Sequence, residues 1–191
     1  MALLFESELR QRASSQVARQ AKSVGGLLSE RATVQLRAEK YDIFLSHSFA
    51  DKELILGAAL ILEDAGYTVY VDWRDDPLLD RSKVTPATAT VLRHRMKLSR
   101  CLFYSTTTTS SDSKWMPWEL GFKDGHNTRA AILPIVLTPT ATFAGQEYLG
   151  LYPYVDKTAG SSGQPRLWIH RSPSCWVHFD DWLKGGEPVE H

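Results

Sequence analysis

An aromatic side chain and a carboxylate stand four residues apart in the stretch Ser113-Lys-Trp-Met-Pro-Trp-Glu-Leu120. The stretch has the pattern of a helix start, and in a helix this spacing places Trp115 and Glu119 on the same face. A single carboxylate beside a π-surface suits a planar cation such as a pyridinium nucleotide. The sequence therefore indicates a catalytic role for Glu119 and a binding role for Trp115.

Both residues also have an ordinary structural interpretation. Glu119 could form an ion pair with Lys123 on an exposed helix face, which stabilises a helix by only about 0.3–0.5 kcal/mol. Trp115 could be a core aromatic, which is the commoner role of a tryptophan. His47 could likewise be a satisfied loop histidine or a nucleotide contact. The residue types alone leave these alternatives open.

Short apolar runs alternate with helical patterns along most of the chain. Residues 43–45 (Ile-Phe-Leu) are typical of a strand buried on both faces, and a helical stripe runs from Asp51, a plausible N-cap, to Gly66. Further strands are expected at 67–71, 101–105, 130–137 and 167–170, and further helices from Pro86, from Trp115 and at 176–183. The alternation predicts an α/β fold whose central, mainly parallel five-stranded sheet carries helices on both faces.

Polar residues gather where these strands end. Ligands of such sheets bind outside the carboxyl ends of the strands. Ser46, His47, Asp72, Trp73 and the hydroxyl-rich loop 106–113 all fall at that edge. They are candidate substrate-binding residues, as are Phe49 after the first strand and Ser82 in the polar segment from Arg74 to Thr85.

The order strand, helix, strand, helix, strand, followed by S-x-W-x-x-x-E-L, resembles the TIR (Toll/interleukin-1 receptor) domain, in particular the small bacterial TIR proteins of Thoeris antiphage systems. The resemblance covers residues 41–137 well and the remainder loosely, and it implies a flavodoxin-like TIR fold. It matches Glu119 to the glutamate of NAD-cleaving TIR domains and Trp115 to the aromatic residue before it. Ser46 and His47 match the end of the first-strand motif. Met116-Pro-Trp118 departs from the residues usual between the tryptophan and the glutamate.

The resemblance implies an NAD⁺ glycohydrolase or ADP-ribosyl cyclase, a hydrolase acting on an N-glycosyl bond, that makes a nucleotide signal in antiviral defence. Nicotinamide leaves a pyridinium as a neutral molecule, so one carboxylate suffices where a glycosidase needs two. No G-x-G-x-x-G and no P-loop occurs, so NAD⁺ is expected as a substrate and no cofactor is expected. Two alternatives stay open: a non-catalytic TIR module acting by homotypic assembly, and a nucleoside deoxyribosyltransferase-like enzyme.

The composition argues against several other classes of function. Lys+Arg and Asp+Glu both number 22 in 191 residues, so net charge gives no case for binding nucleic acid or an anionic membrane. Cys101 and Cys175 form no metal-binding framework, and no metal is expected. The chain has no apolar signal core and no apolar run long enough to cross a bilayer, which favours the cytoplasm.

Three parts of the chain differ in character. Residues 1–40 form an N-terminal helical extension whose stripe Val17, Ala21, Val24 and Leu28 favours packing on the domain over a role as an oligomerisation arm. The resemblance implies that residues 41–184 form the TIR domain, and 185–191 are expected to be a flexible tail.

The segment from Arg74 to Thr85 takes the place of the TIR BB loop and is expected to be exposed. Its centre, Pro77-Leu-Leu79, is an apolar tip between charges of both signs, which suits docking onto a second copy. The sequence therefore predicts self-association through this loop. A downstream effector that responds to a nucleotide product is the other partner expected.

Overall fold

The computed structural model of the chain describes residues 3–20, 40–76, 79, 85–107, 110, 113–138, 147–159 and 165–191. Ser82, the Pro77-Leu78 pair and three residues of the N-terminal stripe (Ala21, Val24 and Leu28) lie outside the described residues.

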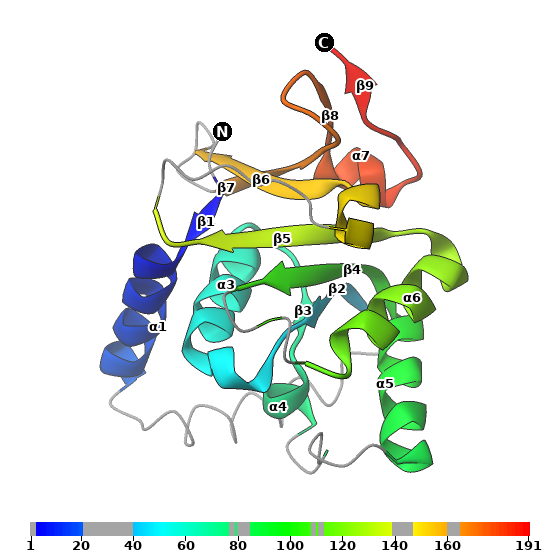
Figure 1. Cartoon of the computed structure of the whole chain (residues 1–191). Helices are drawn as coiled ribbons and strands as arrows, with labels where there is room; N and C mark the ends of the chain where they lie inside the picture. Colours follow the sequence, from blue (N-terminus) through cyan, green and yellow to red (C-terminus); the bar gives the residue numbers. More distant parts are fainter. Residues whose placement is uncertain are drawn as a thin grey trace.

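In these parts of the chain, nine strands form one sheet (Figure 1). They are β1 Leu4–Phe5, β2 Tyr41–Ser46, β3 Val69–Tyr70, β4 Ser99–Thr106, β5 Ala130–Val136, β6 Tyr154–Ala159, β7 Pro165–His170, β8 Cys175–His178 and β9 Val189–Glu190. The order is β3-β2-β4-β5-β6-β7-β8-β9, and β1 pairs with β5.

The first five strands of this order are parallel and carry the predicted fold. Strands β3-β2-β4-β5-β6 pair in parallel, which is the 2-1-3-4-5 order of flavodoxin-like sheets. Strands β2, β4 and β5 are almost completely buried, as their continuous apolar sequences predict. The expected α/β, flavodoxin-like fold is confirmed.

The predicted strand count was wrong at the carboxyl-terminal side. The fifth parallel strand is β6, whereas the strand expected at 167–170 is β7, which runs antiparallel to β6. β7 continues into β8 and β9, also antiparallel. The sheet is wider than five strands because this antiparallel extension adds three strands beyond β6. The extension also includes Val189–Glu190, in the segment where a flexible tail was expected.

Helices cover both faces of the sheet. They are α1 Glu6–Gln20, α3 Lys52–Asp64, α4 Asp72–Asp75, α5 Pro86–Leu98, α6 Met116–Asn127 and α7 Phe179–Leu183, with the 3₁₀ turns η1 Phe49–Asp51 and η3 Glu147–Leu151. Figure 1 shows α1 and α3 on one side and α5 and α6 on the other. Each side has its own hydrophobic cluster: Ile55, Leu62 and Phe179 belong to the first, and Leu92 and Leu120 to the second.

Local signals set the ends of these helices. Thr85 is the N-cap of α5: its side chain accepts a hydrogen bond from the Thr88 N–H, and Pro86 follows at the first helical position. Gly66 follows α3 with φ +96°, the left-handed conformation that glycine adopts without strain. Asp51 has the N-cap position of α3 but no capping bond, because its carboxylate accepts from the Thr107 hydroxyl at 2.6 Å.

The N-terminal helix α1 packs tightly on α3. Leu9 and Ala13 of α1 are buried. At the crossing, a Cβ on Gly57 would lie 2.2 Å from the Leu9 carbonyl oxygen, so only glycine lets the two backbones approach this closely. An ion pair at 2.6 Å between Arg10 and Glu53 flanks the crossing. Residues 3–20 are therefore built into the same globule as the sheet.

Candidate active site

Glu119 is buried at the carboxyl edge of the parallel strands. Its carboxylate accepts a hydrogen bond of 2.6 Å from the Ser46 hydroxyl, and neither side chain is exposed. Ser46 is the last residue of β2, and Glu119 lies in the first turn of α6, where the helix dipole favours an anion. The geometry brings together two of the residues that the sequence predicted for the site.

The alternative of a surface ion pair between Glu119 and Lys123 does not fit this geometry. Both side chains lie on the inward face of α6 with no exposed surface. The Lys123 ammonium donates to the carbonyl oxygens of Met96, at 2.9 Å, and Ser99 at the end of α5. The two charges thus tie α6 to different elements, Glu119 to β2 and Lys123 to α5.

Lys123 gives folding stability a measurable pH dependence. Burial lowers the pKa of its ammonium to about 8 from an ordinary value of 10.5, so above pH 8 the unfolded chain binds more protons than the folded one. Stability therefore rises with pH until the Cys101 thiol, whose pKa burial raises above its ordinary 9.0, opposes the rise. We expect the free energy of unfolding to increase by about 0.6 kcal/mol between pH 8 and pH 9, the difference between a larger rise from Lys123 and a smaller fall from Cys101.

Urea denaturation at the two pH values measures this slope. Lys123→Met should abolish the rise and leave the small fall caused by the Cys101 thiol, because the group that produces the rise is gone. Lys184→Met is the matched control: that side chain is 70% exposed and the slope should survive. A slope that persists in Lys123→Met would assign the effect to another group.

Trp115 lies directly before α6 and is only 7% exposed. It belongs to the hydrophobic cluster on the α5–α6 side of the sheet, and its ring meets Trp118 edge-on with centroids 5.4 Å apart. Its carbonyl oxygen accepts from the Glu119 N–H at 2.9 Å, which fixes the first helical turn. Trp115 therefore has the core packing of a structural aromatic and a place beside the candidate catalytic residue.

His47 and Asp72 form a second pair at the same edge. His47 Nδ1 donates to the Leu45 carbonyl oxygen at 2.7 Å, and Nε2 lies 3.2 Å from Asp72 Oδ1. The second contact has an ion-pair distance, but its angle falls outside hydrogen-bond geometry. Both side chains are buried, so the pair joins the ends of β2 and β3. Because Ser46 and His47 are consecutive, the backbone links this pair to Ser46–Glu119.

Trp73 packs on the α3 side of the sheet. Its ring packs against the hydrophobic cluster of the α1–α3 side, with its centroid 6.4 Å from that of His47. It also lines an apolar cavity of about 500 Å³ between α1 and α3, together with Val17 and Leu56. The Trp73 ring thus lines this cavity and also meets the His47 ring edge-on.

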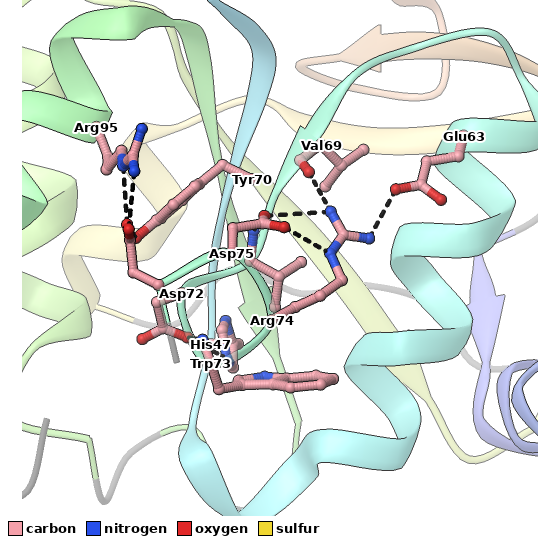
Figure 2. A network of polar contacts seen from close by, with 11 residues as sticks. His47, Glu63, Val69, Tyr70, Asp72, Trp73, Arg74, Asp75 and Arg95 are labelled. Atoms are coloured by element: carbon pink, nitrogen blue, oxygen red, sulfur yellow. Dashed lines mark hydrogen bonds and ion pairs between the residues drawn. The ribbon is translucent and has the colours of Figure 1, made fainter. Parts of the chain in front are cut away.

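The segment that begins at Arg74 is anchored in the fold, in contrast to the exposed loop predicted there. Arg74 is 2% exposed, donates to Glu63 at 2.7 Å and to Asp75 at 3.0 Å, and also donates to the Val69 carbonyl oxygen (Figure 2). Sequence alone could not show this, because the partner Glu63 comes from α3. Arg74 and Asp75 therefore belong to the supporting structure of the site.

Asp76 and Leu79, further along the segment, also contact the rest of the fold. Asp76 accepts two hydrogen bonds from Arg95 of α5, at 2.8 and 2.7 Å, and one from the Tyr70 hydroxyl at 2.8 Å. Leu79, expected at an exposed apolar tip, packs against the α5–α6 cluster. The prediction of an exposed loop was wrong for the residues from Arg74 to Asp76 and for Leu79.

Among the predicted site residues that the structure describes, Phe49 is the exposed one. Its side chain is 61% exposed on η1, and the Lys52 ammonium lies 3.8 Å from the centre of its ring. An aromatic face beside a cation could receive the base and phosphates of a nucleotide. Phe49 and Lys52 therefore form an open surface next to the buried pairs.

Tyr104 is a further candidate site residue that the sequence pattern did not indicate. It pairs with Ser46 in the parallel register of β4 and β2, so the two side chains share a face of the sheet. Burial raises the pKa of its phenol, and Tyr148 of η3 and the charge of Glu119 raise it further. Aligning the ends of the two strands in the sequence could have revealed this position.

The described residues contain no group of three or more His, Cys, Asp or Glu side chains arranged to hold a metal ion. Cys101 and Cys175 are both free thiols. In the same residues, every helix is too short or too polar to span a membrane.

Comparison with known proteins adds two relatives, while no protein-family model matches the chain. The chain is 51% identical over 146 residues to "Probable 3' cyclic ADP-D-ribose synthase ThsB'" of Bacillus cereus (strain MSX-D12), covering 75% of this chain and 76% of the relative. It is 31% identical over 83 residues to "Putative cyclic ADP-D-ribose synthase TIR2" of Cytobacillus dafuensis, covering 43% of this chain and 22% of that relative.

Proposed function

The chain belongs to the family of TIR-domain cyclic ADP-D-ribose synthases that includes ThsB′ of Thoeris systems, and we propose that it cleaves the nicotinamide–ribose bond of NAD⁺ to make a cyclic ADP-ribose. The observation that carries the proposal is the buried Glu119 carboxylate, held by Ser46 at the edge of the sheet where such folds bind ligands. The names of both relatives favour an enzyme over a non-catalytic module.

Glu119 supplies electrostatic stabilisation in this reaction. Nicotinamide departs with the bonding electrons as a neutral molecule, which leaves positive charge on the ribose. A carboxylate stabilises that charge more strongly in the transition state than in the ground state, above all where water is excluded. A hydroxyl of the substrate itself then bonds to the anomeric carbon and loses its proton, which closes the ring. The names of both relatives, which are cyclic ADP-D-ribose synthases, support cyclisation over hydrolysis.

The other candidate residues keep proposed roles in binding. Phe49, with Lys52 beside it, has the exposure to receive an aromatic base and a phosphate. His47 and Asp72 form one of the buried pairs, Trp73 packs beside His47, and Trp115 precedes the helix of Glu119. Ser82 remains a sequence prediction. The relative from Bacillus cereus has a name that specifies the 3′ cyclic product, and we propose the same isomer here.

Regulation of the site is part of the proposal. The substrate reaches a carboxylate with no exposed surface only after its surroundings rearrange, so self-association or a trigger arising during phage infection would control turnover. The product would act on a downstream effector in the cytoplasm as an antiviral signal. Specific activity that rises with protein concentration would support control by self-association.

Incubation of the purified chain with NAD⁺ tests the proposed reaction. Release of nicotinamide together with a product of the mass of cyclic ADP-ribose supports it, and comparison with authentic 3′ cyclic ADP-ribose identifies the isomer. Linear ADP-ribose as the sole product would restrict the activity to hydrolysis. No turnover at any protein concentration, and none in extracts of infected cells, would overturn the proposal.

A further inference from the structure

Ser46 holds the Glu119 carboxylate in a way that a substrate-binding serine would not. Its hydroxyl oxygen lies 2.6 Å from Glu119 Oε2, within the range of about 2.5–2.7 Å for a hydroxyl bonded to an ionised carboxylate. An ionised carboxylate only accepts hydrogen bonds, so Ser46 is the donor. Both side chains are fully buried, which leaves no solvent to replace the bond.

The two ends of this hydrogen bond come from rigid elements. Ser46 ends β2, which pairs with β3 on one side and with β4 on the other, where Tyr104 is its register partner. Glu119 lies in α6, whose next turn is tied to the end of α5 through Lys123. Neither backbone can shift without disturbing a central strand or a buried ammonium. The hydrogen bond therefore restricts rotation of the carboxylate itself.

From this geometry we infer that Ser46 is a positioning residue, which acts through Glu119 and does not contact the substrate. The inference rests on the proposed function and deepens it. A carboxylate that stabilises charge at one ribose carbon must be placed to a fraction of an ångström, and small misplacements lower the rate strongly. Loss of the Ser46 hydroxyl should lower kcat and leave KM unchanged, because substrate binding does not use it.

Steady-state kinetics of Ser46→Ala test the inference. We expect kcat for nicotinamide release to fall about 10- to 100-fold, the effect of losing one hydrogen bond to a charged group, with KM within about twofold of the parent. The acid limb of the pH–rate profile should move to higher pH, because the bond favours the ionised carboxylate. Ser46→Thr, which restores a hydroxyl, should recover most of the rate.

Ser105→Ala is the matched control. Ser105 is also a buried serine near the end of a central strand, and in the described residues its hydroxyl has no hydrogen-bond partner. Its loss should leave kcat within about twofold of the parent. Melting curves for all variants confirm folding. If Ser46→Ala does not fold, Ser46→Cys keeps the volume with a much weaker donor and should show the same loss of kcat.

Three outcomes overturn the inference while the proposed function stands: an unchanged kcat in Ser46→Ala, a raised KM at constant kcat, and an equal loss in Ser105→Ala. A parent chain that never releases nicotinamide overturns the proposed function instead. In that case a crystal structure of Ser46→Ala still decides the positioning role. A rotated Glu119 carboxylate would support it, and an unmoved one would refute it.

Discussion

Glu119→Gln should reduce nicotinamide release by about 10²–10³-fold and leave the fold intact. The amide has nearly the same shape as the carboxylate, and its oxygen can still accept the hydrogen bond that Ser46 donates at 2.6 Å. What the change removes is the negative charge that stabilises the ribose cation, and an aligned electrostatic stabiliser typically contributes this much to the rate. Single-turnover kinetics with NAD⁺ measure the loss directly.

Glu187→Gln provides the control for Glu119→Gln. It makes the same chemical change at a side chain that is 56% exposed and paired with Arg129, and it should leave the rate unchanged. Activity of Glu119→Gln within a few-fold of the parent would remove Glu119 from the catalytic role. Loss of cooperative melting in Glu119→Gln would show that the negative charge of Glu119 is needed for folding.

The central sheet and the position of Glu119 could be predicted from the sequence because both depend on local patterns. Strands buried on both faces have continuous apolar sequences, as β2 and β5 do. The spacing of Trp115 and Glu119 fixes their common helix face whatever the rest of the chain does. Parallel strands then bring Ser46 and the start of α6 to one edge without any knowledge of side-chain contacts.

The antiparallel extension of the sheet could not be predicted in this way. β6 contains Asp156 and Lys157 in its centre, so its sequence does not have the apolar character of a buried parallel strand. Lys157 is held by an ion pair with Glu8 of α1, a partner far away in sequence. The strand forms because β5 and β7 flank it, which no local pattern reports.

Buried charges were the other source of error. The spacing of four between Glu119 and Lys123 left a surface ion pair open as an alternative to catalysis, yet each side chain bonds to a different element inside the protein. Arg74 and Asp75 have the composition of a loop, yet both are buried. A charged residue is buried only where partners from elsewhere in the chain satisfy it, and those partners are set by the tertiary structure.

The network around Arg74 gives the second large expected effect, this time on stability. Asp75 has almost no exposed surface, and burial raises the pKa of its carboxyl while Arg74 opposes the rise. Arg74→Met would leave the Asp75 carboxylate buried without its cation. Removing one partner of a buried ion pair typically costs about 3–5 kcal/mol, so we expect a loss of that size in the free energy of unfolding, measured by urea denaturation.

Two further variants separate the buried charge from simple loss of packing. Arg74→Met/Asp75→Asn removes both charges and keeps an acceptor for the Val71 N–H, which bonds Asp75 at 2.7 Å. This double variant should be more stable than Arg74→Met alone, because the fully buried Asp75 charge is removed together with its cation. Arg100→Met, at a half-exposed ion pair with Asp42, should cost less than about 1 kcal/mol. If the double variant were the least stable of the three, packing of the Arg74 side chain would be the main contribution.

The expected order of stabilities would instead show that the ion pair holds α4 in place, the short helix whose first two residues are Asp72 and Trp73. Nicotinamide release should then fall in Arg74→Met even where the variant is fully folded, since the His47–Asp72 pair depends on that helix.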